Sequence, residues 1–129
     1  MTTQQQLEAA LLFSQSKEIF PLALHTLALL EERYANPPVT VQKTQIKIGP
    51  GGGFCWIWPP RRRIKGGPDH CFYLSFGLRR PLEHPRVAAS AHPTKTRWTI
   101  HTLVENAGDL DSLLLSWLDE AHQTCRTPK

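Results

Sequence analysis

The sequence lacks long apolar runs, a secretory signal and paired cysteines. Its longest apolar runs, such as residues 113–115, are far shorter than the about 20 residues that a membrane-spanning helix needs. Its three cysteines are an odd number and form no Cys-x-x-Cys pair, which favours reduced thiols. The first residues show no basic segment followed by an apolar one, so we expect no signal peptide. The sequence therefore predicts a cytoplasmic protein that does not enter a membrane.

Acidic residues are scarce in the middle of the chain. Residues 37–103 contain eleven Lys or Arg and only two acids, a net charge of +9, whereas residues 1–36 carry −2 and residues 104–129 carry −3. A basic surface attracts polyanions and acidic proteins, whatever fold presents it. The charge distribution therefore predicts a negatively charged partner for the middle segment.

Patterns that would indicate catalysis or metal binding are also missing. The two acids of the middle segment, Asp69 and Glu83, lie apart in loops and make no pair for acid–base chemistry. None of the six histidines has the helical or zinc-finger spacing of metal ligands. The cysteines are interpreted as inert thiols, since no base or pocket can be assigned to them. We therefore expect no metal, no cofactor and no enzymatic activity.

The apolar pattern predicts one α+β domain over residues 1–129. Residues 1–15 are expected to form a short or frayed helix, and a helix with Ser16 as N-cap should continue to about Ala35. The basic β-sheet segment, 39–104, is expected to contain strands at residues 39–48, 54–58, 70–78 and 97–104. An amphipathic C-terminal helix, 106–125, should follow Asn106 as its N-cap.

Two connections complete this prediction. The apolar parity of residues 39–48 changes near Lys43 and Thr44, which suggests a bulge or bend in one strand. Residues 79–96 contain three prolines and are expected to form a long loop.

The expected architecture is a two-layer sandwich, a four-stranded and mainly antiparallel sheet with its N- and C-terminal helices on one face. Strand parity places the following residues in the core: Ile46, Ile48, Phe54, Trp56, Trp58, Phe72, Leu74, Phe76, Leu78, Trp98 and Ile100. The opposite face is then expected to show Lys43, Gln45, Lys47, Tyr73, Ser75, Arg79, Arg97, Thr99 and His101, with Cys55, Ile57 and Cys71 among them.

Several stretches of the chain, taken in order, resemble a small prokaryotic family, domain of unknown function 5655. These stretches are residues 41–46, 54–57, 74–78, 85–87, 97–101, 110–111 and 117–121. The resemblance covers about two-thirds of the chain and implies an α+β domain that occurs alone or joined to other domains. It implies no established activity and carries no catalytic residues.

The charge pattern and the expected sheet face together predict a non-enzymatic binding domain. Consecutive arginines in a loop can hold phosphates, and an aromatic residue among cations can stack on a base. We expect weak binding of nucleic acid or another polyanion through Lys43, Lys47, Arg61, Arg62, Arg63, Lys65, Tyr73, Arg79 and Arg97.

Two alternatives stay open. The open sheet face or the loop could instead bind an acidic protein or a second copy of the chain, giving a homodimer. A small-molecule site between the sheet and the long loop is the third possibility.

Overall fold

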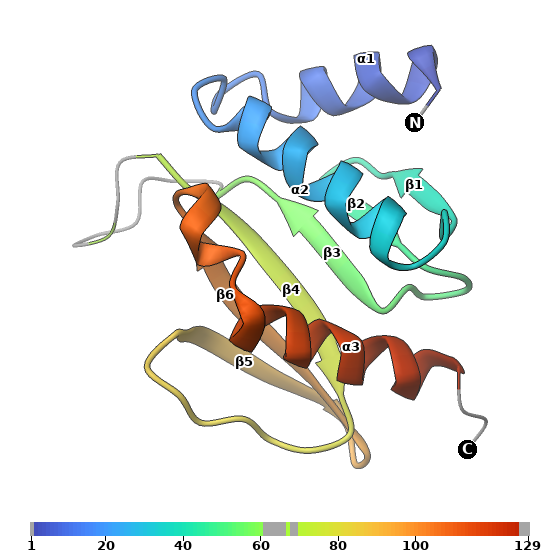
Figure 1. Ribbon diagram of the computed structural model, residues 1–129, viewed down its shortest axis with the longest axis vertical. Helices are drawn as coiled ribbons and strands as arrows, with labels where there is room; N and C mark the ends of the chain where they lie inside the picture. Colours follow the sequence, from blue (N-terminus) through green and yellow to red (C-terminus); the bar gives the residue numbers. More distant parts are fainter. Residues whose placement is uncertain (1, 61–66, 68–69, 127–129) are drawn as a thin grey trace.

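The computed structural model describes residues 2–60, 67 and 70–126 of the chain (Figure 1). The described residues form three α-helices, a short 3-10 helix and six β-strands. Their order is α1 (Thr3–Leu12), α2 (Phe20–Arg33), β1 (Val39–Val41), β2 (Ile46–Ile48), β3 (Cys55–Trp58), β4 (Phe72–Leu78), β5 (Val87–Thr94), β6 (Arg97–Val104), η1 (Ala107–Asp109) and α3 (Ser112–Arg126).

The strands form one antiparallel sheet in the order β1-β2-β3-β4-β6-β5. The predicted α+β class and antiparallel sheet are thereby confirmed. The predicted number of strands is wrong, because the described residues form six strands instead of four. The additional strands arise from the first predicted strand and from the predicted long loop.

The first predicted strand, residues 39–48, is a hairpin. β1 pairs with β2, so that Val39 lies opposite Ile48. The N–H of Gln42 donates to the carbonyl of Gln45 across the turn, at 2.7 Å. The parity change near Lys43 therefore marks a reversal of the chain and not a bulge. Each strand has only three residues, which is too short for its own alternation to reveal the reversal.

The predicted loop, residues 79–96, contains the eight-residue strand β5. It pairs with β6 and forms one edge of the sheet. All of its residues after Val87 are exposed, so the strand has no buried face. Alternation of apolar and polar residues is the signal by which a strand is recognised, and here that signal is absent.

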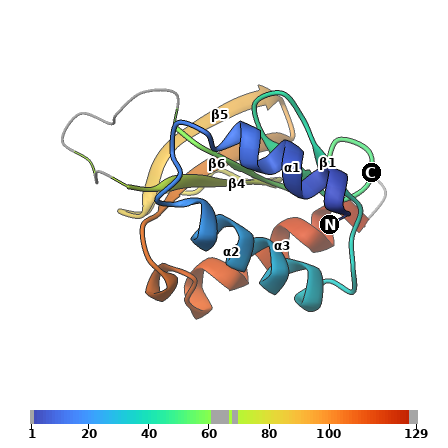
Figure 2. The ribbon, with the colours of Figure 1, turned by 90° about the horizontal axis from the view of Figure 1, so that it is seen from above.

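The helices divide into two groups (Figure 2). α2 and α3 cover one face of the sheet, whereas α1 lies beside the edge strand β1. The amide Nε2 of Gln5 in α1 donates to the carbonyl of Val39 at 2.8 Å, which attaches the helix to that edge. Thr2 and Gln5 also form a capping box that starts α1.

Two helix starts differ from the prediction. Ile19, without a side-chain hydrogen bond, takes the N-cap position of α2 in place of Ser16. Asn106 does cap a helix, together with Asp109, but that helix is the 3-10 turn η1, and α3 begins only at Ser112. At the other end of α2, Ala35 and Asn36 adopt positive φ angles of 56°, so the chain leaves the helix just before the two prolines.

The core lies between the sheet and the layer formed by α2 and α3. It contains Ile46, Ile48, Cys55, Ile57, Phe72, Leu74, Phe76, Leu78, Ile100 and Val104 from the sheet, and Ala23, Leu27, Leu30, Leu114, Trp117, Leu118 and Ala121 from the helices. Among the described residues, no helix combines the length and apolar character that crossing a membrane requires.

Candidate functional site

The register between β3 and β4 determines which side chains leave the core. Cys55 and Ile57 lie opposite Phe76 and Leu74 and are fully buried. Because side chains alternate along a strand, the two neighbouring tryptophans project from the sheet face opposite α2 and α3, which we call the open face. The prediction that placed Trp56 and Trp58 in the core, and Cys55 and Ile57 outside it, is therefore wrong.

The sequence of β3 explains this error. The strand reads Cys-Trp-Ile-Trp, so both of its faces are apolar and polarity does not distinguish them. The core accepts the smaller pair, while each indole N–H faces outward, where it can reach a polar partner or water. That need for a partner is the signal in the sequence that could have identified Trp56 and Trp58 as site residues.

Aromatic rings gather on the open face. Trp58 and Tyr73 stack with ring centroids 4.1 Å apart and planes inclined by 14°. His101 meets the ring of Trp58 edge-on, with centroids 5.7 Å apart. Within the described parts of the chain, the indole of Trp56 has neither a ring partner nor a hydrogen bond. Trp56 therefore offers an aromatic surface that the domain itself does not use.

A line of hydrogen bonds connects three of these strands. Nε1 of Trp58 donates to Oγ of Ser75 at 2.9 Å, and Oγ of Ser75 lies 2.6 Å from Nδ1 of His101. Burial lowers the pKa of His101 below its ordinary value, because the charged ring would lose hydration. The histidine is therefore held mainly in its neutral form at neutral pH.

A serine beside a histidine can act as a nucleophile, but the surroundings of Ser75 do not suit that role. Ser75 is only 1% exposed and lies within the central strand β4, which pairs with β3 on one side and β6 on the other. Backbone N–H groups used in sheet pairing are not free to form an oxyanion hole. The geometry is that of a fixed polar contact, which orients His101.

A hollow of about 930 Å³ lies over this part of the open face. Its walls come from the end of α1, the β1–β2 turn and the sheet, and the described residues of its lining include one lysine and no carboxylate. The lining residues are Leu12, Gln15, Ser16, Lys43, Thr44, Gln45, Gly52, Trp56, Trp58, Pro59, Pro60, Ser75, Thr99 and His101. No residue of 79–96 lines this hollow, so it is not the predicted crevice beside the long loop.

Four of the predicted binding residues lie on or beside the open face. Lys43 lines the hollow, and Tyr73 stacks on Trp58. Lys47 is paired with Trp56 across the β2–β3 ladder, and its ammonium group donates to the carbonyl of Gly51. Arg97 lies over Gly77, its Nε 3.8 Å from the position that a Cβ atom would take there.

The other predicted binding residues are not brought together with these four. The guanidinium of Arg79 donates to the carbonyl of Thr124 near the end of α3, so its predicted place on the open face is wrong. Arg61, Arg62, Arg63 and Lys65 lie outside the described residues.

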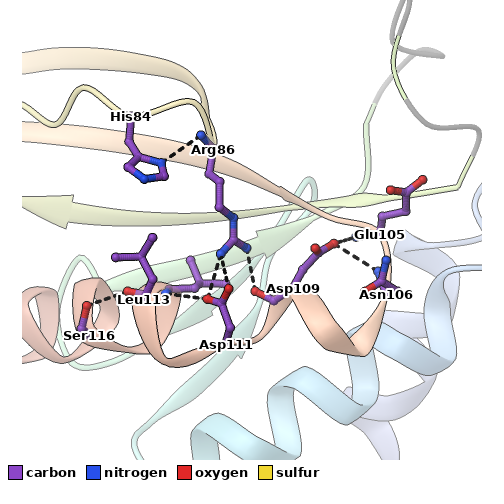
Figure 3. Close-up of polar contacts among 9 residues, drawn as sticks. His84, Arg86, Glu105, Asn106, Asp109, Asp111, Leu113 and Ser116 are labelled. Carbon is purple, nitrogen blue, oxygen red and sulfur yellow. Dashed lines mark hydrogen bonds and ion pairs between the residues drawn. The ribbon is translucent and has the colours of Figure 1, made fainter.

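Two further cations of the basic segment pair with acids of the C-terminal region. Arg80 makes a two-pronged contact with Glu120 at 2.8 Å. Arg86 binds both carboxylate oxygens of Asp111 and also donates to the carbonyl of Asp109 at 2.6 Å (Figure 3). A backbone hydrogen bond from Leu114, followed by the contact with Arg86, lowers the pKa of Asp111. These arginines therefore tie the sheet to α3 and contribute little positive charge to a binding surface.

No group of three metal-binding side chains occurs among the residues that the structure describes. Cys71, predicted to face outward, is buried, and this burial, together with the charge of Glu105, raises the pKa of its thiol. A protonated thiol is a poor nucleophile and a poor metal ligand. The open face therefore offers rings, a few hydrogen-bonding groups and cations, which is chemistry suited to binding.

The chain matches no family model, no curated protein and no solved structure. Its resemblance to domain of unknown function 5655 therefore stays a prediction.

Proposed function

We propose that this protein is a non-enzymatic domain that binds single-stranded nucleic acid on its open face. The observation that supports this proposal is the meeting of unused aromatic surface and positive charge on one side of the sheet. Trp56 lies at the hollow, with Lys43 in the same lining and Lys47 directly across the ladder. Stacked bases and neighbouring phosphates are the two features that such a surface recognises.

Charge supports the same ligand. The described residues that line the hollow include no acid, so none of them repels a polyanion. Arg97 extends the cationic border along β6. The cluster of Arg61, Arg62, Arg63 and Lys65 follows Pro60, a lining residue, directly in the sequence. Phosphate contacts of this kind are sequence-independent and weaken as salt rises.

Single strands are favoured over duplexes because stacking on a protein ring requires an exposed base. In a double helix the base faces are covered by their neighbours, and only the backbone and the groove edges remain accessible. Trp56 therefore gains nothing from a duplex, whereas each stacked base of a single strand contributes about 1–3 kcal/mol.

The proposal is tested by fluorescence anisotropy with a labelled oligothymidylate and with a duplex of the same length. We expect tighter binding of the single strand, and a loss of about tenfold or more in the Trp56→Ala variant. The duplex affinity should change little in that variant. Equal binding of both ligands, or an unchanged affinity of Trp56→Ala for the single strand, would contradict the proposal.

One observation favours self-association as a second function. The outer edge of β5 has no strand partner among the described residues, and the strand carries no charged side chain. Pro93 and two register shifts interrupt the strand, so the edge available for pairing is short. A second copy could extend the sheet there and produce the homodimer. Light scattering after size-exclusion chromatography tests this idea, since a monomer at high protein concentration would exclude it.

A further inference from the structure

We infer that the hollow is a seat for one unpaired base, in which the Nε2–H group of His101 donates to an acceptor on the base edge. This inference rests on the proposed function and adds to it a specific way of recognising the base. A carbonyl oxygen or a ring nitrogen of the base would serve as the acceptor.

One direction of the bonds from Trp58 to His101 gives every buried donor in the line an acceptor. An indole N–H is always a donor, so Oγ of Ser75 must accept the bond from Trp58. The hydroxyl proton of Ser75 then needs an acceptor, and among the described residues Nδ1 of His101 is its one partner. Nδ1 of His101 therefore accepts, and in the neutral ring the proton resides on Nε2.

Neutral His101 fits this assignment. Burial lowers its pKa, which disfavours the form with protons on both nitrogens. In a doubly protonated ring Nδ1–H would donate to Oγ of Ser75, and the buried serine hydroxyl would lose its one acceptor among the described residues. The lowered pKa thus favours the neutral ring, and the hydrogen bond from Ser75 places its proton on Nε2.

Nε2 is the nitrogen available to a ligand. It has no hydrogen-bond partner within the described part of the chain, and His101 lines the hollow. Nδ1 is engaged with Ser75, so the opposite side of the ring carries the unused donor. An unused donor beside unused aromatic surface is the arrangement that a planar ligand with polar edges satisfies.

The sheet register places the ring of Trp56 and the ring of His101 far enough apart for one base to contact both. Trp56, Ser75 and His101 form one row across β3, β4 and β6, because Trp56 lies opposite Ser75 and Ser75 opposite His101. Neighbouring strands are about 4.8 Å apart, so the backbones of the two outer residues are about 10 Å apart. All three residues of this row line the hollow, where Ser75 is covered by the rings of Trp58 and His101 that bond to its hydroxyl.

Three tetranucleotides with identical phosphates test the seat. The first is built from thymidine, the second from the difluorotoluene isostere of thymidine, and the third from abasic sugars. The isostere has the shape of thymidine but accepts hydrogen bonds poorly. We expect thymidine to bind about three- to tenfold more tightly than the isostere, because one hydrogen bond is lost. The strand with the isostere should bind at least about tenfold more tightly than the abasic strand, because the abasic strand has no base that can stack on Trp56.

Variants identify the residues responsible. In His101→Phe, thymidine and its isostere should bind equally, while both remain tighter than the abasic strand. In Trp56→Ala, the ratio of the affinities for the isostere strand and the abasic strand should decrease. The exposed Lys95→Ala variant, in the β5–β6 turn, is the control and should keep the ranking of the wild type.

Nitrogen NMR of His101 gives a readout that does not depend on the ligand. The wild type should show a neutral ring protonated at Nε2 at neutral pH, and Ser75→Ala should lose this single tautomer. A ring protonated at Nδ1, or charged, would overturn the assignment of the donor.

The outcomes separate this inference from the proposed function. If all three tetranucleotides bind equally well, the seat is wrong and phosphate-mediated binding survives. If the isostere binds as well as thymidine, stacking survives and the role of His101 is wrong. If none binds, the proposed function itself fails.

Discussion

At the scale of one residue, His101 contributes to the pH dependence of the stability of the domain. Burial lowers its pKa in the folded protein below the ordinary value of about 6.5, which the unfolded chain retains. As the pH falls below that value, the unfolded chain takes up the proton first, so the free energy of unfolding decreases. His101→Gln lacks this contribution.

We therefore expect the stability difference between the wild type and His101→Gln to shrink as the pH falls from about 8 to about 5. Urea unfolding followed by tryptophan fluorescence measures this difference at each pH. A difference that stays constant over the range would show that the ring titrates equally in both states.

Gly49 occupies a turn in which a side chain should destabilise the fold. Its φ angle is +112°, and a Cβ atom there would come within 2.6 Å of Cδ1 of the buried Phe54. Both the backbone conformation and the packing oppose a side chain. We expect Gly49→Ala to lower the free energy of unfolding by about 1–3 kcal/mol.

Gly52→Ala is the matched control for this prediction. It lies in the same turn, but a Cβ atom there meets no atom within 4 Å. Thermal or urea unfolding should show a change within about 0.5 kcal/mol for this variant. Equal losses for the two variants would refute the role assigned to Gly49.

At the scale of elements, one acid joins the two helices of the core layer. Asp119 of α3 accepts two hydrogen bonds from Arg33, at 2.8 and 2.6 Å, and a third from the hydroxyl of Tyr34 at 2.8 Å. The contact with Arg33, and after it the one with Tyr34, lowers the pKa of Asp119. Charged Asp119 therefore stabilises the packing of α2 against α3.

We expect Asp119→Asn to lower the free energy of unfolding by about 1 kcal/mol at neutral pH, since the ion pair is partly exposed. Because the folded-state pKa is depressed, the loss should vanish as the pH falls below the unfolded value of about 3.9 and through the folded one. Denaturation curves at neutral and acidic pH test this, with the exposed Glu32→Gln as control. An equal effect of the control variant would show that only net charge matters.

The strands show how far the sequence reveals the elements and where it stops. β4 and β6 alternate apolar and polar residues, and both were predicted from that pattern. β5 could not be predicted from the sequence, since a strand that is exposed on both faces has no buried side to mark it. β1 and β2 were predicted as one strand, because each has only three residues, too few to reveal the turn between them.

The candidate site was predicted only in part for the same reason. Parity within their strands predicted the face on which Lys47, Tyr73 and Arg97 lie, whereas Lys43 reaches the hollow from the β1–β2 turn. The orientation of Trp56 depends on the packing of β3 against the helices, and a strand with apolar residues on both faces does not encode it locally. Contacts between distant segments, such as that of Arg79 with α3, are equally invisible to local patterns.

At the scale of the whole molecule, the basic middle of the chain is divided between two tasks. Arg80 and Arg86 hold α3 through its acids, whereas Lys43 and Lys47 border the open face. The net charge of the segment therefore overstates the charge that a ligand meets. Removing a cation that borders the open face should therefore affect ligand binding more than removing one that is paired with an acid.

We expect Lys43→Gln to weaken binding of oligothymidylate and to reduce the salt slope of log K by about 0.7, the value for one phosphate contact to a single strand. Arg80→Gln should change that slope little, because its charge is already paired with Glu120. Anisotropy titrations over a range of salt concentrations measure both slopes. Equal reductions would mean that the domain attracts nucleic acid by net charge alone.

The four tryptophans allow the most direct measurement of the central claim, that the open face binds single-stranded nucleic acid. Trp56 and Trp58 line the hollow, whereas Trp98 and Trp117 pack against the core. In two-dimensional NMR spectra, each indole N–H gives its own signal during a titration with oligothymidylate. We expect the signals of Trp56 and Trp58 to shift while those of Trp98 and Trp117 stay in place. Unmoved signals of Trp56 and Trp58 at saturating ligand would contradict it.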